Sequence, residues 1–168
     1  MILTRDVILR EIAAGRIAFE PFNADQVAAA HHPDLVAEVE VDGGGADPVP
    51  VVDEADYRAI TRVQPLVAPY VLKPGETIHA ITRERITLPD DVGGWLEGRS
   101  RFARLGLMIH VTSGFVAPGV VSRQVLEMSN VAGRPLAIHP GVRICQIVLQ
   151  RCEGHAVYAG RFARQDRL

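Results

Sequence analysis

Residues 88–119 read LPDDVGGWLEGRSRFARLGLMIHVTSGFVAPG, and they alternate short apolar runs with turn signals. The runs GWLEG and LMIHVT have the length of strands, whereas LPDD and SGFVAPG carry the proline, glycine, aspartate and serine residues that favour turns. This alternation predicts strands joined by short turns. We interpret the arginine-rich segment GRSRFARLGL, residues 98–107, as a turn that leads from one strand into the next.

The same pattern continues on both sides of this stretch. The further apolar runs are YVL, TIHAIT, RITL, QVLEMSN, LAIHP and RICQIVLQRC, with KPGE, AGRP and HPG as turn signals. Upstream, LVAEVEV at residues 35–41 alternates like a strand, and IAFEPFNADQ at residues 17–26 fits a strand and a turn. Many short strands of this kind predict a mostly β protein, either a β-barrel or a sandwich.

One segment has a clear helical pattern, namely RDVILREIAA at residues 5–14. Thr4 is suited to the N-cap, and Ile8 and Ile12 lie on one face of the predicted helix. Gly15 favours the end of the helix at this point. We therefore expect a short N-terminal helix before the first strand.

The length and composition fit one domain over residues 1–168, and the location expected for it is the cytoplasm. The chain is 48% hydrophobic and 23% charged, but no apolar run reaches the roughly 20 residues that a membrane span needs. The start, MILTRDVILREI, mixes charged with apolar residues and lacks a small-residue cleavage site. Cys145 and Cys152 are too few for a disulfide framework or a zinc site, so we expect buried or idle thiols.

Charge is divided unevenly along the chain. Residues 1–97 hold 8 basic and 17 acidic side chains, whereas residues 98–168 hold 10 basic and 3 acidic ones, and all ten bases are arginine. Arginine presents a planar set of donors that matches phosphate oxygens, so this half of the chain suits a polyphosphate ligand better than duplex DNA. The alternative is that these arginines pair with the acidic half.

The strand-and-turn segments together resemble the dCTP deaminase branch of the dUTPase-like superfamily. They comprise residues 88–119, VLEMSNVAGRPLAIHPGVRICQIVL at 125–149, and the terminal segments at 4–22 and 158–165. The resemblance weakens across residues 28–60, where the glycine-rich segment 42–50 is a candidate mobile insertion. It implies a dUTPase-like distorted β-barrel (β-clip) that forms a homotrimer, with active sites at subunit boundaries and with magnesium bound through a nucleoside triphosphate.

The function implied by the resemblance is zinc-independent hydrolytic deamination of dCTP, or of a closely related cytosine nucleotide, to dUTP and ammonia. Glu127 matches the family's catalytic glutamate, and Ser100 and Arg104 match the serine and arginine that hold the water and the developing oxyanion. The H-x-E and P-C-x-x-C signature of zinc deaminases does not occur in this sequence, so we expect no protein-bound metal.

The resemblance also implies a set of substrate-binding positions. Arg99 and Gln146 match triphosphate contacts, and TSGFVAPG corresponds to the loop that lines the base and sugar pocket. The expected ligand is dCTP, with dUTP and dTTP as further candidates, and neither nucleic acid nor a membrane is expected as a partner. The expected binding residues are Arg99, Arg101, Thr112, Ser113, Phe115, Val116, Gln146, Arg161 and Gln165.

Several positions depart from the family pattern. Ala117 stands where the family has an aspartate, which activates water for triphosphate cleavage in the dUTPase branch. An alanine cannot accept a proton, so this residue counts against dUTP pyrophosphatase activity and also puts recognition of the deoxyribose in doubt. Arg101 replaces a small serine beside the phosphates, and the carboxy-terminal tail is short, with Arg161 and Gln165 as substitutes for its usual residues.

Alternatives therefore stay open for the function and for single residues. Besides the deaminase, we consider a dUTP pyrophosphatase and a non-catalytic member that binds a nucleotide. His110 lies in an apolar run and is expected to be a hydrogen-bonded core residue rather than a substrate contact. Trp95 is expected in the core or an interface rather than stacked on a base. His31 and His32 are expected in a loop, because neighbours on a strand point to opposite faces.

Overall fold

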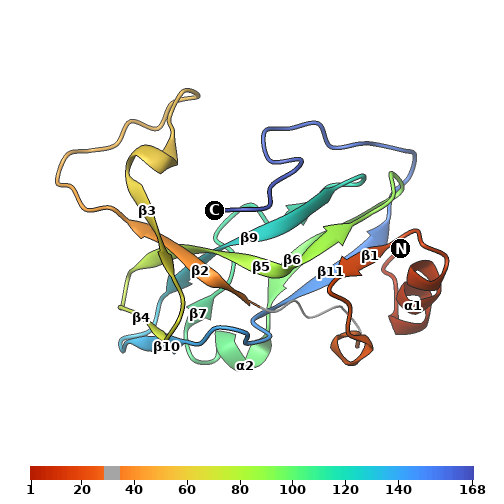
Figure 1. Cartoon of the computed structure of the whole chain (residues 1–168), viewed down its shortest axis with the longest axis horizontal. Helices are drawn as coiled ribbons and strands as arrows, with labels where there is room; N and C mark the ends of the chain where they lie inside the picture. Colours follow the sequence, from red (N-terminus) through yellow and green to blue (C-terminus); the bar gives the residue numbers. More distant parts are fainter. Residues whose placement is uncertain (29–34) are drawn as a thin grey trace.

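The computed structural model describes residues 1–28 and 35–168, and the regular secondary structure of this part of the chain is mostly β-strand (Figure 1). A short helix precedes the first strand. The predicted fold class, mostly β with a short N-terminal helix, is therefore confirmed. The loop expected at His31 and His32 lies outside the described residues.

The largest sheet has six strands in the order β3-β2-β5-β9-β7, with β1 paired to β5 off this path. All of its pairs are antiparallel. Because β2 and β9 both pair with β5, they flank it on opposite sides (Figure 1). The strands are β1 (Ala18–Glu20), β2 (Leu35–Asp42), β3 (Thr61–Pro65), β5 (Thr77–Thr87), β7 (Leu107–Met108) and β9 (Val121–Asn130).

Two smaller sheets and four short helical segments complete the described fold. A three-stranded sheet has the order β11-β6-β8, and β10 pairs with β4. The strands are β4 (Tyr70–Leu72), β6 (Val92–Gly98), β8 (Phe115–Val116), β10 (Leu136–Ile138) and β11 (Cys145–Arg151). The helical segments are α1 (Arg5–Ala13), α2 (Ser100–Ala103), η1 (Ala24–Gln26) and η2 (Tyr57–Ala59).

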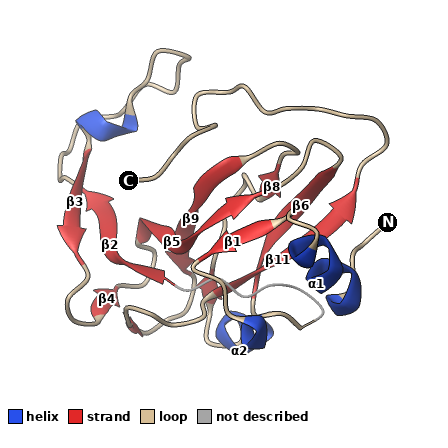
Figure 2. Ribbon diagram, turned by 45° about the vertical axis from the view of Figure 1, so that its right-hand side comes forward, coloured by secondary structure: helices blue, strands red, loops and turns tan. Residues whose placement is uncertain are grey.

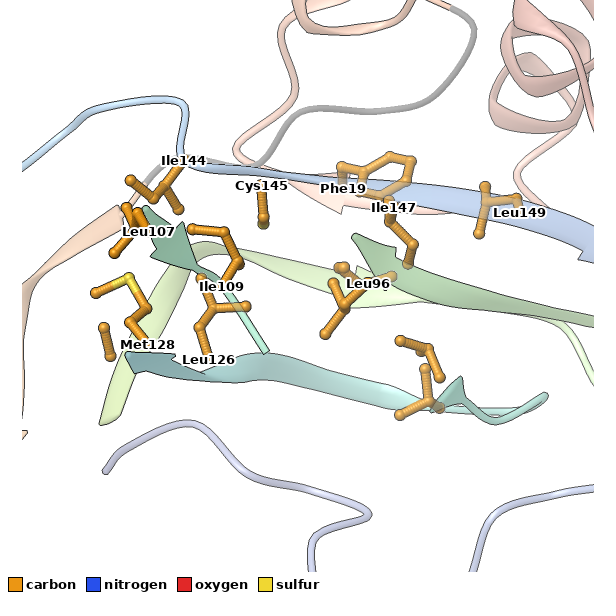
Figure 3. Packing of buried hydrophobic residues seen from close by; sticks show 14 of the residues in the cluster. Phe19, Leu96, Leu107, Ile109, Leu126, Met128, Ile144, Cys145, Ile147 and Leu149 are labelled. Carbon is orange, nitrogen blue, oxygen red and sulfur yellow. The ribbon is translucent and has the colours of Figure 1, made fainter. Parts of the chain in front are cut away.

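The core is a cluster of apolar side chains that point toward one another from β6, β7, β9 and β11 (Figure 3). On β9, Leu126 and Met128 are fully buried in this cluster, while Glu127 between them is partly exposed. Successive residues of a strand point to opposite faces, so burying the two apolar neighbours places Glu127 on the outer face of the largest sheet. The core thereby fixes the direction of this carboxylate.

Helix α1 follows the sequence prediction closely. It begins after Thr4, and Gly15, at φ +70°, lies just beyond its end. Ile8 is fully buried and Ile12 packs against the core, as the predicted apolar face requires. Thr4 occupies the N-cap position, but its hydroxyl donates to Asp6 Oδ1 at 2.6 Å instead of satisfying a backbone amide.

Four charged side chains fasten α1 to the end of β11 and to the residue before β6. Glu11 accepts hydrogen bonds from Arg16 at 2.7 Å and from Arg151. Asp91 accepts from the same two arginines, at 2.6 Å from Arg16 and 3.2 Å from Arg151. The hydrogen bond from Arg16, opposed by burial and supported by Arg151, lowers the pKa of the Glu11 carboxyl. This network closes the edge of the fold where α1 lies.

The residues before α1 also pair with β11. Ile2 forms a β-bridge with Gln150, and the backbone N–H of Leu3 donates to Leu149 O at 2.8 Å. Figure 2 shows α1 next to β11 at this edge of the molecule. The amino-terminal residues are therefore held against the last strand of the fold.

Three local predictions differ from the structure. Residues 98–107 contain the short helix α2 rather than only a turn, and Gly106 at φ +84° follows that helix. The run LMIHVT is a strand only over Leu107–Met108, and the expected turn SGFVAPG contains β8. Strand β3 was not predicted, because TRVQP lacks a clear alternation of apolar and polar residues.

No helix in the described ranges, 1–28 and 35–168, is long and apolar enough to cross a membrane.

Candidate active site

A cavity of about 420 Å³ lies where β6 ends and α2 begins. Gly98, Arg99, Ser100 and Arg101 line it from this connection, and Gln146 reaches it from β11. Gln146 is paired with Glu97 across the two strands, and its amide donates to Gly98 O at 3.4 Å. Four predicted site residues therefore meet in one cavity, namely Arg99, Ser100, Arg101 and Gln146.

This cavity is positively charged. The Arg99 guanidinium donates to Arg143 O at 2.6 Å, and its pKa is lowered by burial first and then by the nearby charges of Arg101 and Arg143. None of these three arginines has a carboxylate partner among the described residues. Guanidinium groups that repel one another at a cavity wall are stabilised by a bound anion, and phosphate oxygens match their donor geometry.

The alternative, that the arginines of residues 98–168 pair with the acidic half of the chain, applies to two of the ten. Arg151 pairs with Glu11 and Asp91, and Arg161 pairs with Asp56 at 3.6 Å. No ion pair joins the other eight to residues of the acidic half within the described part of the chain. Pairing within the chain therefore leaves most of this positive charge available for a ligand.

Glu127 lies on β9, and its side chain is 29% exposed. Its Oε2 accepts a hydrogen bond from the backbone N–H of Thr112 at 3.3 Å. Thr112 belongs to the loop between β7 and β8, so this contact joins the predicted catalytic carboxylate to the predicted pocket loop. A partly exposed carboxylate with a free oxygen is able to accept a proton from a water molecule.

His110 is a residue whose position beside the carboxylate the sequence did not reveal. Its Nδ1 lies 3.4 Å from Glu127 Oε2, yet this atom is buried and has no hydrogen-bond partner. The predicted burial of His110 is confirmed, and its Nδ1 makes a long contact with Glu127 rather than a short, well-aligned hydrogen bond. Burial lowers the pKa of His110, and the charge of Glu127 opposes this shift.

Ser100 and Arg104 are not brought to Glu127 within one chain. Ser100 is the first residue of α2, and Arg104 is exposed at the C-cap of the same helix. No hydrogen bond or ion pair joins either side chain to Glu127 in the described part of the structure. Within a single chain, the arginine-lined cavity and the Glu127 carboxylate, with the loop that contacts it, are thus separate.

The predicted loop residues differ in their surroundings. Thr112 and Ser113 are exposed, and Phe115 is 48% exposed. The Val116 side chain is buried in the core, which leaves only its backbone to face a ligand. Phe115 packs against Trp95, with ring centroids 5.1 Å apart, and Trp95 is 45% exposed. Trp95 is therefore not a core residue of the single chain.

Arg161 and Gln165 lie in a different cavity, of about 410 Å³, that the carboxy-terminal segment forms with Arg58 of η2. The Gln165 backbone oxygen accepts from Arg123 N on β9 at 2.8 Å. The structure therefore does not bring these two predicted phosphate ligands to Arg99 and Ser100.

The donor set of the arginine cavity fits a metal ion only together with an anion. Within residues 1–28 and 35–168, no group of three or more histidine, cysteine, aspartate or glutamate side chains is arranged to hold a metal ion. Arginine and glutamine side chains surround the cavity, and cationic walls repel a bare divalent ion. A magnesium ion fits here when phosphate oxygens supply its ligands.

Comparison with known proteins identifies similar chains over most of this sequence. A family model described as dCTP deaminase-like matches residues 2–152. A "dCTP deaminase, dUMP-forming" of Leifsonia xyli subsp. xyli is 36% identical over 179 aligned positions, which cover 98% of this chain and 87% of the relative. A protein of the same name from Mycolicibacterium smegmatis is 40% identical over 162 positions, which cover 90% and 81%.

A solved structure has a similar fold. The 2'-deoxycytidine 5'-triphosphate deaminase from Agrobacterium tumefaciens superposes with a TM-score of 0.70 at 22% sequence identity. The match covers 90% of this chain and 48% of the solved one, so this chain spans about half the length of that protein. At this identity the similarity concerns the fold.

Proposed function

The chain belongs to the dCTP deaminase-like family, and on this premise we propose that it removes the 4-amino group of dCTP by hydrolysis, without zinc. The observation that carries this proposal is the arginine cavity at the end of β6, whose guanidinium groups have no carboxylate partner among the described residues. A triphosphate supplies the anion that this cavity requires. Relatives named dCTP deaminase support cytosine as the base.

In the proposed reaction, water attacks C4 of the cytosine while Glu127 accepts a proton from that water. The resulting tetrahedral centre carries negative charge, which hydrogen-bond donors must stabilise, and Ser100 and Arg104 are proposed for this role. Glu127 then returns its proton to the departing amino group, which leaves as ammonia. The C4 hydroxyl then loses its proton and N3 gains one, which gives the uracil carbonyl. Water and dCTP are thus converted to dUTP and ammonia, and Glu127 ends in its starting state.

Magnesium enters this proposal only with the substrate. Bound to the triphosphate, it would neutralise part of the phosphate charge, and Arg99, Arg101 and Gln146 would hold the remaining oxygens. The protein's own residues carry the binding of the phosphates and the proton transfers at the base.

Because Ser100 and Arg104 lie apart from Glu127 in one chain, we propose that these groups meet between subunits of a homotrimer. Two observations support this arrangement. The described residues place no predicted catalytic partner against Glu127, and the exposed aromatic pair Trp95 and Phe115 offers apolar surface for a neighbouring copy.

The product tests the proposed function directly, because the relatives from Leifsonia xyli subsp. xyli and Mycolicibacterium smegmatis are named dUMP-forming. We expect purified protein with dCTP and magnesium to release ammonia and dUTP in equal amounts, without dUMP, since Ala117 has no group that could activate water for triphosphate cleavage. Ion-pair chromatography of the nucleotides beside an ammonia assay measures this outcome. The same assay with CTP tests whether the protein distinguishes deoxyribose from ribose.

Each other product pattern contradicts a specific part of the proposal. Formation of dUMP from dCTP would show that the triphosphate is cleaved despite Ala117. Calorimetric binding of dCTP without any product would support the non-catalytic alternative. If neither cytosine nor uracil nucleotides bind in calorimetry, both enzymatic hypotheses, the deaminase and the dUTP pyrophosphatase, are wrong.

Arg99→Ala is expected to weaken dCTP binding more than turnover. Loss of a charged hydrogen-bond donor to phosphate costs about 1.5–3 kcal/mol, which corresponds to a Kd increase of roughly 10- to 100-fold at low salt. The increase should shrink as ionic strength rises, because salt screens charge pairs. Arg104→Ala should instead lower kcat. Calorimetry and steady-state rates at two salt concentrations measure both effects, and equal, salt-independent losses would contradict this division of roles.

A further inference from the structure

Glu127 is one of three polar side chains that form a row across three neighbouring strands. The register pairs Glu40 on β2 with His79 on β5, and it pairs His79 with Glu127 on β9. Directly opposed residues on antiparallel strands point to the same face, with their Cβ atoms about 4.5–5.5 Å apart. A carboxylate, an imidazole and the proposed catalytic carboxylate therefore lie side by side on the outer face of the largest sheet.

Glu40 is held firmly at one end of this row. It is only 3% exposed, and both of its carboxylate oxygens are engaged. Oε1 accepts from the Thr61 hydroxyl at 2.6 Å, and Oε2 lies 2.8 Å from His79 Nδ1. A buried carboxylate requires such partners, because it has lost its hydration.

Segment η2 covers this pair from above the sheet. The Tyr57 ring packs edge-on against the His79 ring, with centroids 5.7 Å apart and planes at 88°. The Thr61 hydroxyl also lies 3.0 Å from Tyr57 O, which links η2 to the start of β3. His79 is thus held at Nδ1 by Glu40 and packed at right angles against the Tyr57 ring.

These contacts determine which edge of His79 faces Glu127. Because Glu40 accepts at Nδ1, the neutral ring carries its hydrogen on Nδ1 and leaves Nε2 as an acceptor. In an imidazole, Nδ1 and the Cδ2–Nε2 edge lie on opposite sides of the bond to Cβ. Since β2 and β9 flank β5 on opposite sides, a ring whose Nδ1 faces Glu40 on β2 has its Cδ2–Nε2 edge on the side of β9, where Glu127 is the paired residue; this orientation is part of the inference.

We propose that His79, oriented by Glu40, is a positioning residue for Glu127 during proton transfer, an inference that rests on the proposed function. When Glu127 takes the proton from water, its carboxyl becomes a donor, and His79 Nε2 is the acceptor across the strand. This interaction keeps the protonated side chain in one orientation until the proton passes to the departing amino group, which then leaves as ammonia. His79 takes up no proton overall. Among the described residues, two further ionisable groups contact the row, namely His110 beside Glu127 and Tyr57 beside His79.

The test compares substitutions at His79 with a matched substitution on the same strand. His79→Leu should lower kcat for dCTP about tenfold and leave KM within about twofold, because positioning acts on the reacting geometry and not on the phosphates. His79→Gln should restore most of the loss, since an amide can donate to Glu40 and accept from Glu127. Thr77→Val is the control, because Thr77 points to the same face of β5 but is paired with Ser129; its kcat should not change.

A second variant controls for effects on folding, because His79→Leu leaves the Glu40 carboxylate buried without its partner. The double variant Glu40→Leu with His79→Leu replaces both polar groups by apolar ones, a change that buried pairs often tolerate. We expect the same tenfold loss of kcat from it, with a thermal unfolding midpoint close to that of the wild type.

The possible failures are distinguishable when Glu127→Gln is assayed in the same series. If the wild type releases no ammonia from dCTP, the proposed function is wrong and this inference falls with it. If the wild type is active and Glu127→Gln is inactive, but a folded His79→Leu or double variant keeps the wild-type kcat, only the positioning role is overturned. A rise in KM alone would also overturn it, since it would show a role in binding.

Discussion

Glu127→Gln is expected to reduce ammonia release from dCTP about a thousandfold, the range typical of a lost general base. Glutamine has nearly the same shape and can still accept the hydrogen bond from Thr112 N, but its amide cannot take a proton from water. The arginine cavity is untouched, so the Kd for dCTP should stay within about threefold of the wild-type value. Single-turnover rates and calorimetry on the same preparation separate the two quantities.

The matched control is Glu97→Gln. Glu97 is an exposed glutamate on β6, paired with Gln146 next to the arginine cavity. Its substitution therefore makes the same chemical change close to the cavity that is proposed to bind the phosphates. Its kcat should equal that of the wild type. If Glu127→Gln kept its rate, or if both variants lost it equally, the assignment of Glu127 as the proton acceptor would be wrong.

A mixing experiment tests whether Glu127 and Arg104 of one active site come from different subunits. Glu127→Gln and Arg104→Ala subunits, denatured and refolded together, should regain activity if one site takes Glu127 from one subunit and Arg104 from its neighbour. With random assembly, about a quarter of the sites would contain both intact residues in a closed symmetric trimer. Recovery of no activity, with trimers verified by light scattering, would place both residues in one subunit's own site.

Gly106→Ala is expected to destabilise the fold by about 3 kcal/mol, from about 1–2 kcal/mol of left-handed backbone strain and about 1–3 kcal/mol of overpacking. Gly106 has φ +84°, and a Cβ there would lie 2.6 Å from Ala132 Cβ and 2.9 Å from Ala132 N. For a chain of this size, the thermal midpoint should fall by about 6–12 °C. Differential scanning calorimetry measures this shift.

Gly133→Ala provides the control in the adjoining loop. A Cβ at Gly133 would meet nothing within 4 Å, so its midpoint should change little. Equal midpoints for the two variants would contradict the close approach at Ala132. Gly106 also joins α2 to β7, and its carbonyl accepts from Val131 N at 2.9 Å, so its replacement should disturb the placement of Arg104 as well.

The elements that the sequence predicted are those whose signal is local. Helix α1 has an apolar face and a terminal glycine, and the main strands carry alternating residues between turn signals. The same alternation placed Glu127 between two buried residues, so its outward direction follows from the pattern itself. Helix α2 escaped prediction because four residues are too few for a helical period to be visible.

The features that the sequence could not predict depend on tertiary placement. The pairing of Glu40 with His79 follows from the strand register and from the cover by η2, and neither is encoded in the spacing of the two residues. Arg161 and Gln165 lie by Arg58 and β9 because the carboxy-terminal segment folds back on its own chain. The proximity of His110 to Glu127 likewise requires the loop after β7 to return toward β9.

The attachment of the amino terminus to β11 has a consequence for synthesis on the ribosome. Glu11 binds Arg151, and Ile2 bridges Gln150, so helix α1 gains these partners only after residues 150 and 151 have been translated. Until then its apolar face has no final docking place, and contacts between such distant residues are slow to form. The residues of α1 thus reach their native environment only after the strands that follow them have been synthesised.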